Sequence, residues 1–103
     1  MTAISKERWW TLTFAQQFAN IGSEVGRAAK WQGKDENSFW GAVTRAVELI
    51  DLTQSDKRWS KRRSEINRAK ELFADAVLGS TEYKTTLEDL EKYFMQFAMV
   101  AMR

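Results

Sequence analysis

The sequence predicts an all-α fold, an up-down four-helix bundle that oligomerises, and three observations point to it. Proline is absent and only five glycines occur in 103 residues, so the turn residues of a many-stranded β-fold are missing. Apolar residues recur at spacings of three and four positions over four long segments. The proposed connections are short enough to join antiparallel helices. We therefore expect one domain over residues 1–103, with a tail over 1–10 and helices over about 13–32, 36–54, 57–78 and 86–102.

The first helix is indicated by its start and by two rows of side chains. Thr13 followed by Gln16 has the pattern of a capping box. The apolar row consists of Phe14, Phe18, Ile21, Val25 and Ala29. The row of small residues beside it consists of Ala15, Ala19, Gly22, Gly26 and Ala29. Because small side chains let a neighbouring backbone come close, this second row predicts a tight helix crossing.

The second and third helices follow short polar turns. Gly33 is a natural helix stop, and Asp35 or Asn37 can cap the second helix. Its inward row is Phe39, Val43, Ala46 and Ile50, widened by Trp40, Val47 and Leu49. A row this wide predicts neighbours on two sides. The third helix carries Trp59, Ile66, Ala69, Phe73 and Val77 and ends at Gly79.

The last helix is apolar on every side. Thr85 with Glu88 predicts its capping box. Its inward seam is Leu87, Leu90, Phe94, Phe97 and Ala101. The apolar side chains that need further cover are Tyr93, Met95, Met99 and Met102. We expect a second copy or a protein partner to supply that cover; the alternative is a central helix whose outer face is covered by loops and whose methionines fill the core.

Positive charge is concentrated between residues 57 and 70. The cations there are Lys57, Arg58, Lys61, Arg62, Arg63, Arg68 and Lys70, which with one acid, Glu65, give a net charge of +6. The rest of the chain has nine cations and thirteen acids, a net charge of −4. On an α-helix Arg58, Lys61 and Arg62 share a face, which suits contact with successive phosphates. The alternatives are a solvated face or a site for an acidic protein.

Five tryptophans, at positions 9, 10, 31, 40 and 59, lie near proposed helix ends or turns. Core packing is the first interpretation, because tryptophan is a large side chain that buries well when its N–H is bonded. Trp59, inside the basic stretch, either stacks on a base or anchors the segment in the core. Trp9 and Trp10 lie outside any apolar row, so we assign these two to a partner contact.

Composition excludes many activities. The absence of Cys and His excludes thiolate and imidazole metal sites, disulfides and Ser-His or Cys-His catalysis, so we expect no cofactor, no metal and no catalytic residue. The first eight residues lack the apolar core of a signal peptide, and no stretch is long and apolar enough to span a membrane. We therefore expect a cytoplasmic protein that does not bind a membrane.

One enzymatic hypothesis remains, and it depends on three carboxylate pairs. They are Glu48 with Asp51, Glu71 with Asp75, and Glu88 with Glu91. Two such pairs on neighbouring helices hold magnesium in all-α nucleoside-triphosphate pyrophosphohydrolases, where oxygen ligands suffice. The surrounding acids of that family are missing here, and salt bridges on helix surfaces explain the pairs more simply.

Several segments together resemble a family of small uncharacterised prokaryotic helical proteins. They are Ala19-Asn-Ile-Gly-Ser-Glu-Val-Gly-Arg-Ala28, Trp31, Arg45-Ala-Val-Glu-Leu-Ile-Asp-Leu-Thr53, Glu82-Tyr83 and Lys92-Tyr-Phe94, within residues 9–98. This resemblance implies a fold and no activity. At the level of fold alone, the chain is similar to four-helix-bundle intervening-sequence proteins and to the accessory variability proteins of diversity-generating retroelements. Those are homo-oligomers that associate with reverse transcriptase and RNA, and the similarity assigns no residue.

The sequence thus favours a non-enzymatic, oligomeric accessory protein that binds nucleic acid, RNA rather than DNA, through a basic helix. Its partner is expected to be a reverse transcriptase or another nucleic-acid enzyme. The alternative is a protein-interaction module that docks through its apolar last helix. A magnesium-dependent nucleotide hydrolase is the third hypothesis.

Overall fold

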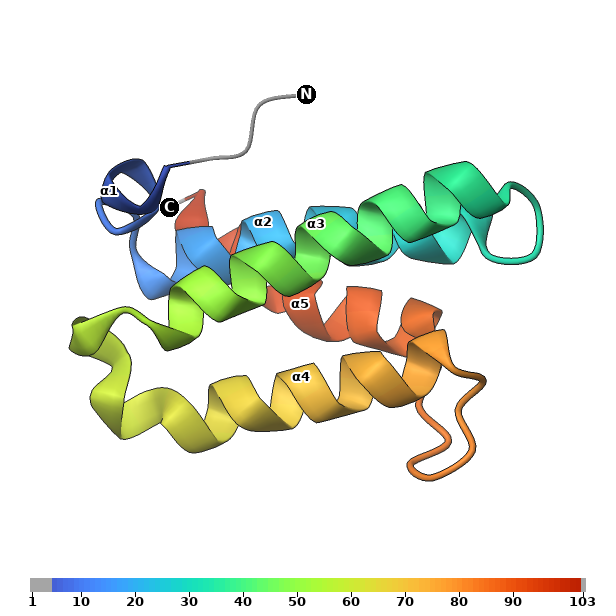
Figure 1. The fold of residues 1–103 in the computed structure, drawn as a ribbon. Coiled ribbons are helices and arrows are strands. Elements are labelled where there is room, and N and C mark those ends of the chain that lie inside the picture. Colours follow the sequence, from blue (N-terminus) through green and yellow to red (C-terminus); the bar gives the residue numbers. More distant parts are fainter. Residues whose placement is uncertain (1–4, 103) are drawn as a thin grey trace.

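Four long helices lie side by side and alternate in direction along the chain (Figure 1). The computed structural model describes residues 5–102. Its elements are α1 (Lys6–Trp9), α2 (Phe14–Trp31), α3 (Glu36–Gln54), the 3-10 helix η1 (Lys57–Arg62), α4 (Arg63–Val77) and α5 (Leu87–Ala101). The radius of gyration of the Cα atoms is 13.1 Å, close to the value of about 13 Å expected for a compact chain of about 100 residues. The predicted all-α class is confirmed.

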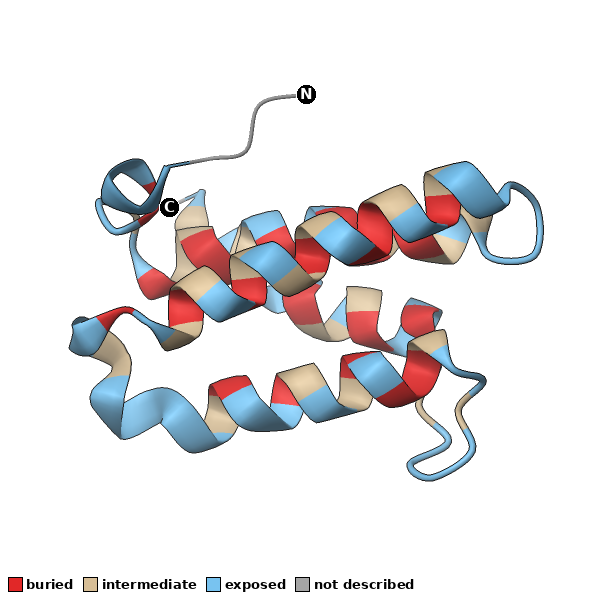
Figure 2. Cartoon of the chain, in the orientation of Figure 1, coloured by how far each residue is buried: buried red, intermediate tan, exposed pale blue. Residues whose placement is uncertain are grey.

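The core is built around α2, which packs between α3 and α5, while α4 packs less extensively against α3 and α5. Buried side chains line the facing sides of the long helices, and the outer faces are exposed (Figure 2). From α2 the core receives Phe14, Phe18, Ile21 and Val25, as the apolar row predicts. The wide row of α3 is confirmed only in part, because Trp40 near its start is 48% exposed.

The predicted tight crossing lies between α2 and α5. A Cβ atom placed on Gly22 would be 2.5 Å from the Cβ of Phe94, and one placed on Gly26 would be 2.6 Å from a carboxylate oxygen of Glu91. Real Cβ atoms do not approach other atoms this closely, so Gly22 determines how near the helices come, whereas at Gly26 the flexible Glu91 side chain can move away. The row of small residues therefore has the packing role that the sequence predicts.

The helix starts follow the predicted pattern in two cases and differ in one. Thr13 and Gln16 form the capping box of α2, with N···O distances of 2.8 and 3.1 Å. Asp35 caps α3 by accepting the Ser38 N–H. The box before α5 is formed by Thr86 and Asp89, one residue later than the predicted pair of Thr85 and Glu88. The Ser80 hydroxyl donates to the carbonyl of Thr85, which holds that residue in the preceding loop.

Two parts of the sequence prediction are wrong at the same end of the molecule. The expected tail over 1–10 contains α1, which Ser5 caps by accepting the Arg8 N–H; positions 1–4 lie outside the described residues. The expected helix over 57–78 is divided into η1 and α4, with non-helical dihedral angles at Trp59 (φ −100°, ψ 22°). No helix of the described chain combines the length and apolar character needed to cross a bilayer.

Candidate nucleic-acid interface

A buried polar network joins α1, α2, α3 and η1 at one end of the molecule. The fully buried Gln17 donates from Nε2 to the Trp9 carbonyl (2.9 Å) and to the Asp56 carboxylate (3.2 Å). Its Oε1 accepts the indole N–H of Trp59 (2.9 Å). The indole N–H of Trp9 donates to the Thr53 hydroxyl (3.0 Å). These bonds fix the positions of α1 and η1, and we call α1, η1 and the first turn of α4 the basic end.

Arg58 and Arg62 help to hold this end together. The Arg58 guanidinium lies 2.6 Å from an Asp56 carboxylate oxygen and donates to the Leu12 carbonyl at 2.7 Å. The hydrogen bond from Arg58 lowers the pKa of Asp56, and the same bond raises the pKa of Arg58. The Arg62 guanidinium lies 3.9 Å from the centre of the Phe14 ring and 3.6 Å from Glu65. Both cations therefore have intramolecular partners that compete with a phosphate for the guanidinium.

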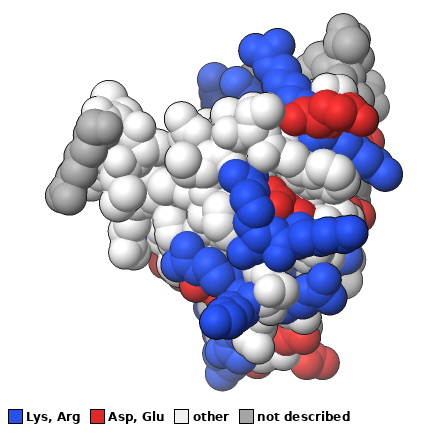
Figure 3. Space-filling view, turned by 90° about the vertical axis from the view of Figure 1, so that its left-hand side faces the viewer, with Lys and Arg blue, Asp and Glu red and all other residues white. Residues whose placement is uncertain are grey.

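Three other cations of the predicted site, Lys57, Lys61 and Arg63, are exposed and have neither an ion pair nor an aromatic ring partner within the described residues. Two more exposed cations, Lys6 and Arg8, lie on α1 at the same end. We call these five side chains the free cations. Figure 3 views this end, where Lys and Arg side chains gather beside a broad surface without charged side chains. Lys6 and Arg8 lie outside the predicted site; the signal in the sequence that indicates their helix is Ser5, a good helix cap.

The remaining predicted cations point to other partners. Arg68 lies over the ring of Tyr83, 5.3 Å from its centre, and Lys70 forms an ion pair with Asp51 at 2.9 Å. The predicted shared α-helical face of Arg58, Lys61 and Arg62 is also wrong, because the backbone there is a kinked 3-10 helix. The +6 segment is therefore not one uniform surface, and its exposed cations without an acid partner are concentrated near its start.

The partner contact predicted for Trp9 is wrong, whereas Trp59 takes the anchoring role, one of its two predicted alternatives. Trp9 is only 1% exposed and belongs to the core, so it is not available to a partner. Trp59 anchors η1, with its indole N–H bonded to Gln17, its ring edge-on to Phe14 and the Arg58 guanidinium 4.4 Å from its ring centre. Trp10 is 37% exposed. Of the two tryptophans assigned to a partner contact, Trp10 alone lies at the surface.

The outer face of α5 is an exposed apolar surface. Met95, Met99 and Met102 are 58%, 72% and 87% exposed. A groove of about 140 Å³ runs beside Met95, between α5 and the small residues of α2. No loop of the described chain covers these methionines, which contradicts the alternative of a central, covered helix. Tyr93 differs from them, because it turns inward and burial raises its pKa.

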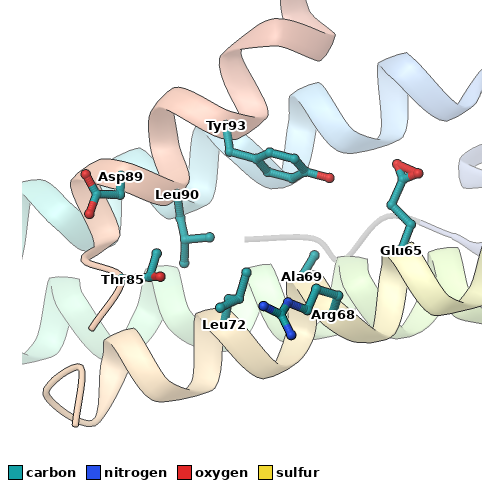
Figure 4. A pocket seen from close by; sticks show the side chains of 8 residues that line it. All are labelled: Glu65, Arg68, Ala69, Leu72, Thr85, Asp89, Leu90 and Tyr93. Carbon is teal, nitrogen blue, oxygen red and sulfur yellow. The ribbon is translucent and has the colours of Figure 1, made fainter. Parts of the chain in front are cut away.

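Tyr93 lines a second cavity, of about 210 Å³, between α4 and α5. Figure 4 shows its ring pointing across the cavity from α5, with Leu72 and Leu90 among the apolar walls. The charged side chains around it are Glu65, Arg68 and Asp89. Asp89 accepts the backbone N–H of Thr86, which lowers the pKa of Asp89. These charged groups already have protein partners.

The carboxylate pairs of the hydrolase hypothesis do not form a metal site. Asp51 pairs with Lys70, and the buried Asp75 accepts the backbone N–H groups of Glu82 (2.9 Å) and Tyr83 (3.0 Å). The bond from Glu82 lowers the pKa of Asp75. Within residues 5–102 no three acids gather around a position where a cation would bind.

Comparisons with protein families, with curated proteins and with solved structures found no match to this chain.

Proposed function

We propose that this chain is a non-enzymatic accessory protein that binds nucleic acid, RNA in preference to DNA, through the free cations of the basic end. The observation that carries the proposal is the separation of charge. The segment from Lys57 to Lys70 has a net charge of +6 and the rest of the chain −4. Lys57, Lys61 and Arg63 are exposed there without an ion-pair partner in the described chain.

The mechanism would be the neutralisation of phosphates, with release of the counterions that they hold. Lysine and arginine side chains at a surface bind phosphate without reading the base sequence. The buried network supports this function because it fixes η1 without occupying Lys57 or Lys61. A backbone segment that is already fixed loses less conformational entropy on binding than a flexible one.

The proposed setting is an up-down four-helix bundle in the cytoplasm that acts beside a reverse transcriptase or another nucleic-acid enzyme. The alternating directions of the four long helices support the bundle. The enzyme partner is proposed from the sequence resemblance alone, which is a resemblance in fold and assigns no residue.

A matched pair of charge-reversal variants tests this proposal. The first variant replaces Lys57, Lys61 and Arg63 by Glu. The control replaces Lys30, Lys34 and Lys92, which are exposed and lie outside the basic end, by Glu. Both variants change the net charge of the chain by the same amount, so a general charge effect would weaken both equally. Affinity is measured at low salt for a labelled structured RNA and a duplex DNA.

The proposal predicts that the first variant binds at least about tenfold more weakly than wild type and that the control variant loses much less affinity. The wild type is expected to bind the structured RNA more tightly than the duplex DNA. Equal losses in the two variants would show that the basic end is not the site. Absence of wild-type binding at low salt would overturn the proposal.

A second candidate function is supported by the exposed methionines of α5. Met95, Met99 and Met102 are spaced by four and three residues, so they form one face of the helix. An exposed apolar face of this kind is typical of a contact with another protein, here proposed to be a second copy of the chain. Methionine suits such a contact because its unbranched side chain adapts to its partner.

The assembly test measures the mass of the protein in solution by sedimentation over a range of concentrations. Met99→Lys is expected to dissociate the assembly. Leu78→Lys is the control, because Leu78 is similarly exposed, at 74%, at the far end of α4. A wild-type monomer at the highest concentration would refute this second function and leave the first intact.

A further inference from the structure

Trp10 is an exposed aromatic side chain that directly follows the helix carrying two of the free cations. It is 37% exposed, and its indole N–H donates to the carbonyl of Leu52 at 3.1 Å. Lys6 and Arg8 precede it on α1, and Lys57 follows Leu52 by five residues. The indole is therefore held at one edge, while part of its surface is open to solvent at the same end of the molecule as the free cations.

The other aromatic rings of this end are occupied by protein contacts. Trp9 is in the core, with its N–H bonded to Thr53. Trp59 contacts the Arg58 guanidinium, and the Phe14 ring is buried beneath the guanidinium of Arg62. Trp10 thus remains as the aromatic side chain that a ligand at the free cations could reach without displacing part of the core.

We propose that Trp10 is a stacking platform for an unpaired base, so that the preferred ligand of the basic end is single-stranded nucleic acid. This inference rests on the proposed function and specifies its ligand. Aromatic side chains beside a basic surface bind single strands because every base has a face that can stack. A base within a duplex is already stacked on its neighbours and is reached only by disrupting the duplex. The hydrogen bond to Leu52 orients the indole before a base arrives, which reduces the entropy lost on binding.

The test separates stacking from phosphate binding by comparing three probes. They are a labelled uridine oligomer of about 12 nucleotides, an oligomer with the same number of phosphates but no bases, and an RNA duplex. The variants are Trp10→Leu, which removes the aromatic face, and Trp10→Phe, which keeps an aromatic face but loses the bond to Leu52. Trp40→Leu is the matched control, because Trp40 is also exposed, at 48%, and lies near the start of α3. Circular dichroism verifies that each variant is folded.

Wild type and Trp40→Leu are expected to bind the uridine oligomer about tenfold more tightly than the oligomer without bases. Trp10→Phe is expected to keep a smaller preference, because its ring can stack on a base but is not oriented by the bond to Leu52. Trp10→Leu is expected to lose this preference while its affinity for the duplex stays within about twofold of wild type. A preference that survives in Trp10→Leu, or that wild type lacks, would overturn the inference and leave phosphate binding standing. Failure of wild type to bind any of the three probes would overturn both the inference and the proposed function.

Discussion

Replacement of Gly22 by alanine is expected to destabilise the fold, although the same change stabilises most helices. Alanine is favoured over glycine inside a helix by about 1 kcal/mol. At Gly22 the added methyl group would lie 2.5 Å from the Cβ of Phe94, an atom that moves only if α5 moves. An extra methyl group forced into a packed core costs about 1–3 kcal/mol. The net effect is a loss of up to about 2 kcal/mol in the free energy of unfolding.

Two other glycines provide internal controls. At Gly41 in α3 the nearest atom to an added Cβ would be the Arg45 guanidinium at 3.5 Å, an ordinary contact. Gly41→Ala should therefore stabilise the protein by about 1 kcal/mol. At Gly26 the close atom belongs to the flexible carboxylate of Glu91. The stability of Gly26→Ala should therefore lie between those of Gly22→Ala and Gly41→Ala.

Thermal and urea unfolding followed by circular dichroism measure this series. A difference of about 1–3 kcal/mol between Gly41→Ala and Gly22→Ala corresponds to about 5–15 °C in Tm for a chain of this size. The reasoning would be refuted if Gly22→Ala were as stable as Gly41→Ala. Such a result would show that α2 and α5 do not cross as closely as the structure indicates.

Three further predictions concern polar side chains that form hydrogen bonds in the structure. Gln17→Leu leaves three hydrogen-bonding partners at the basic end without their bonds. The free energy of unfolding, measured in urea, should fall by about 3 kcal/mol. A loss below about 0.5 kcal/mol would contradict the central role of Gln17. The pKa values of Asp56, Asp75 and Asp89 are lowered in the folded protein. Their contribution to stability is fully present above the unfolded pKa of about 3.9 and is lost as the pH falls through the folded pKa values. The free energy of unfolding should therefore fall below about pH 4, and a flat profile down to pH 2 would refute this. Asp75→Asn should speed hydrogen exchange at the backbone amides of Glu82 and Tyr83 and leave exchange in α2 as it is in wild type. If exchange at these two amides did not change, the result would count against their hydrogen bonds to Asp75.

The parts of the fold that depend on local pattern could be predicted from the sequence. Phe14, Phe18 and Ile21 recur at helical spacing, and this spacing is sufficient to identify the buried face of α2. Thr13 and Gln16 are three residues apart, so their capping box is visible in the sequence. The small residues around Gly22 likewise indicated a close crossing, although they did not identify α5 as the helix that approaches.

The parts that depend on contacts between distant segments could not be predicted. Trp9 and Trp10 are adjacent in a short polar segment, and the burial of Trp9 depends on Thr53, 44 positions away. The kink at Trp59 involves neither proline nor glycine; the Trp59 side chain is held by Gln17, 42 positions away.

The candidate site shows the same limit. The sequence located the basic segment but did not separate its exposed cations from those with partners. Lys70 is paired with Asp51 on another helix, 19 positions away, and Arg62 lies over Phe14 of α2. Such pairings become visible only when the helices are placed against one another.

The salt dependence of duplex DNA binding tests the central claim most directly, because its slope counts the phosphates that the protein neutralises. If the five free cations each contact one phosphate, a plot of log affinity against log salt for wild type should have a slope of about −4.5. Reversal of Lys57, Lys61 and Arg63 should leave two contacts and a slope of about −1.8, while reversal of Lys30, Lys34 and Lys92 should leave the wild-type slope. Equal slopes for wild type and the first variant would contradict the claim that the basic end binds nucleic acid.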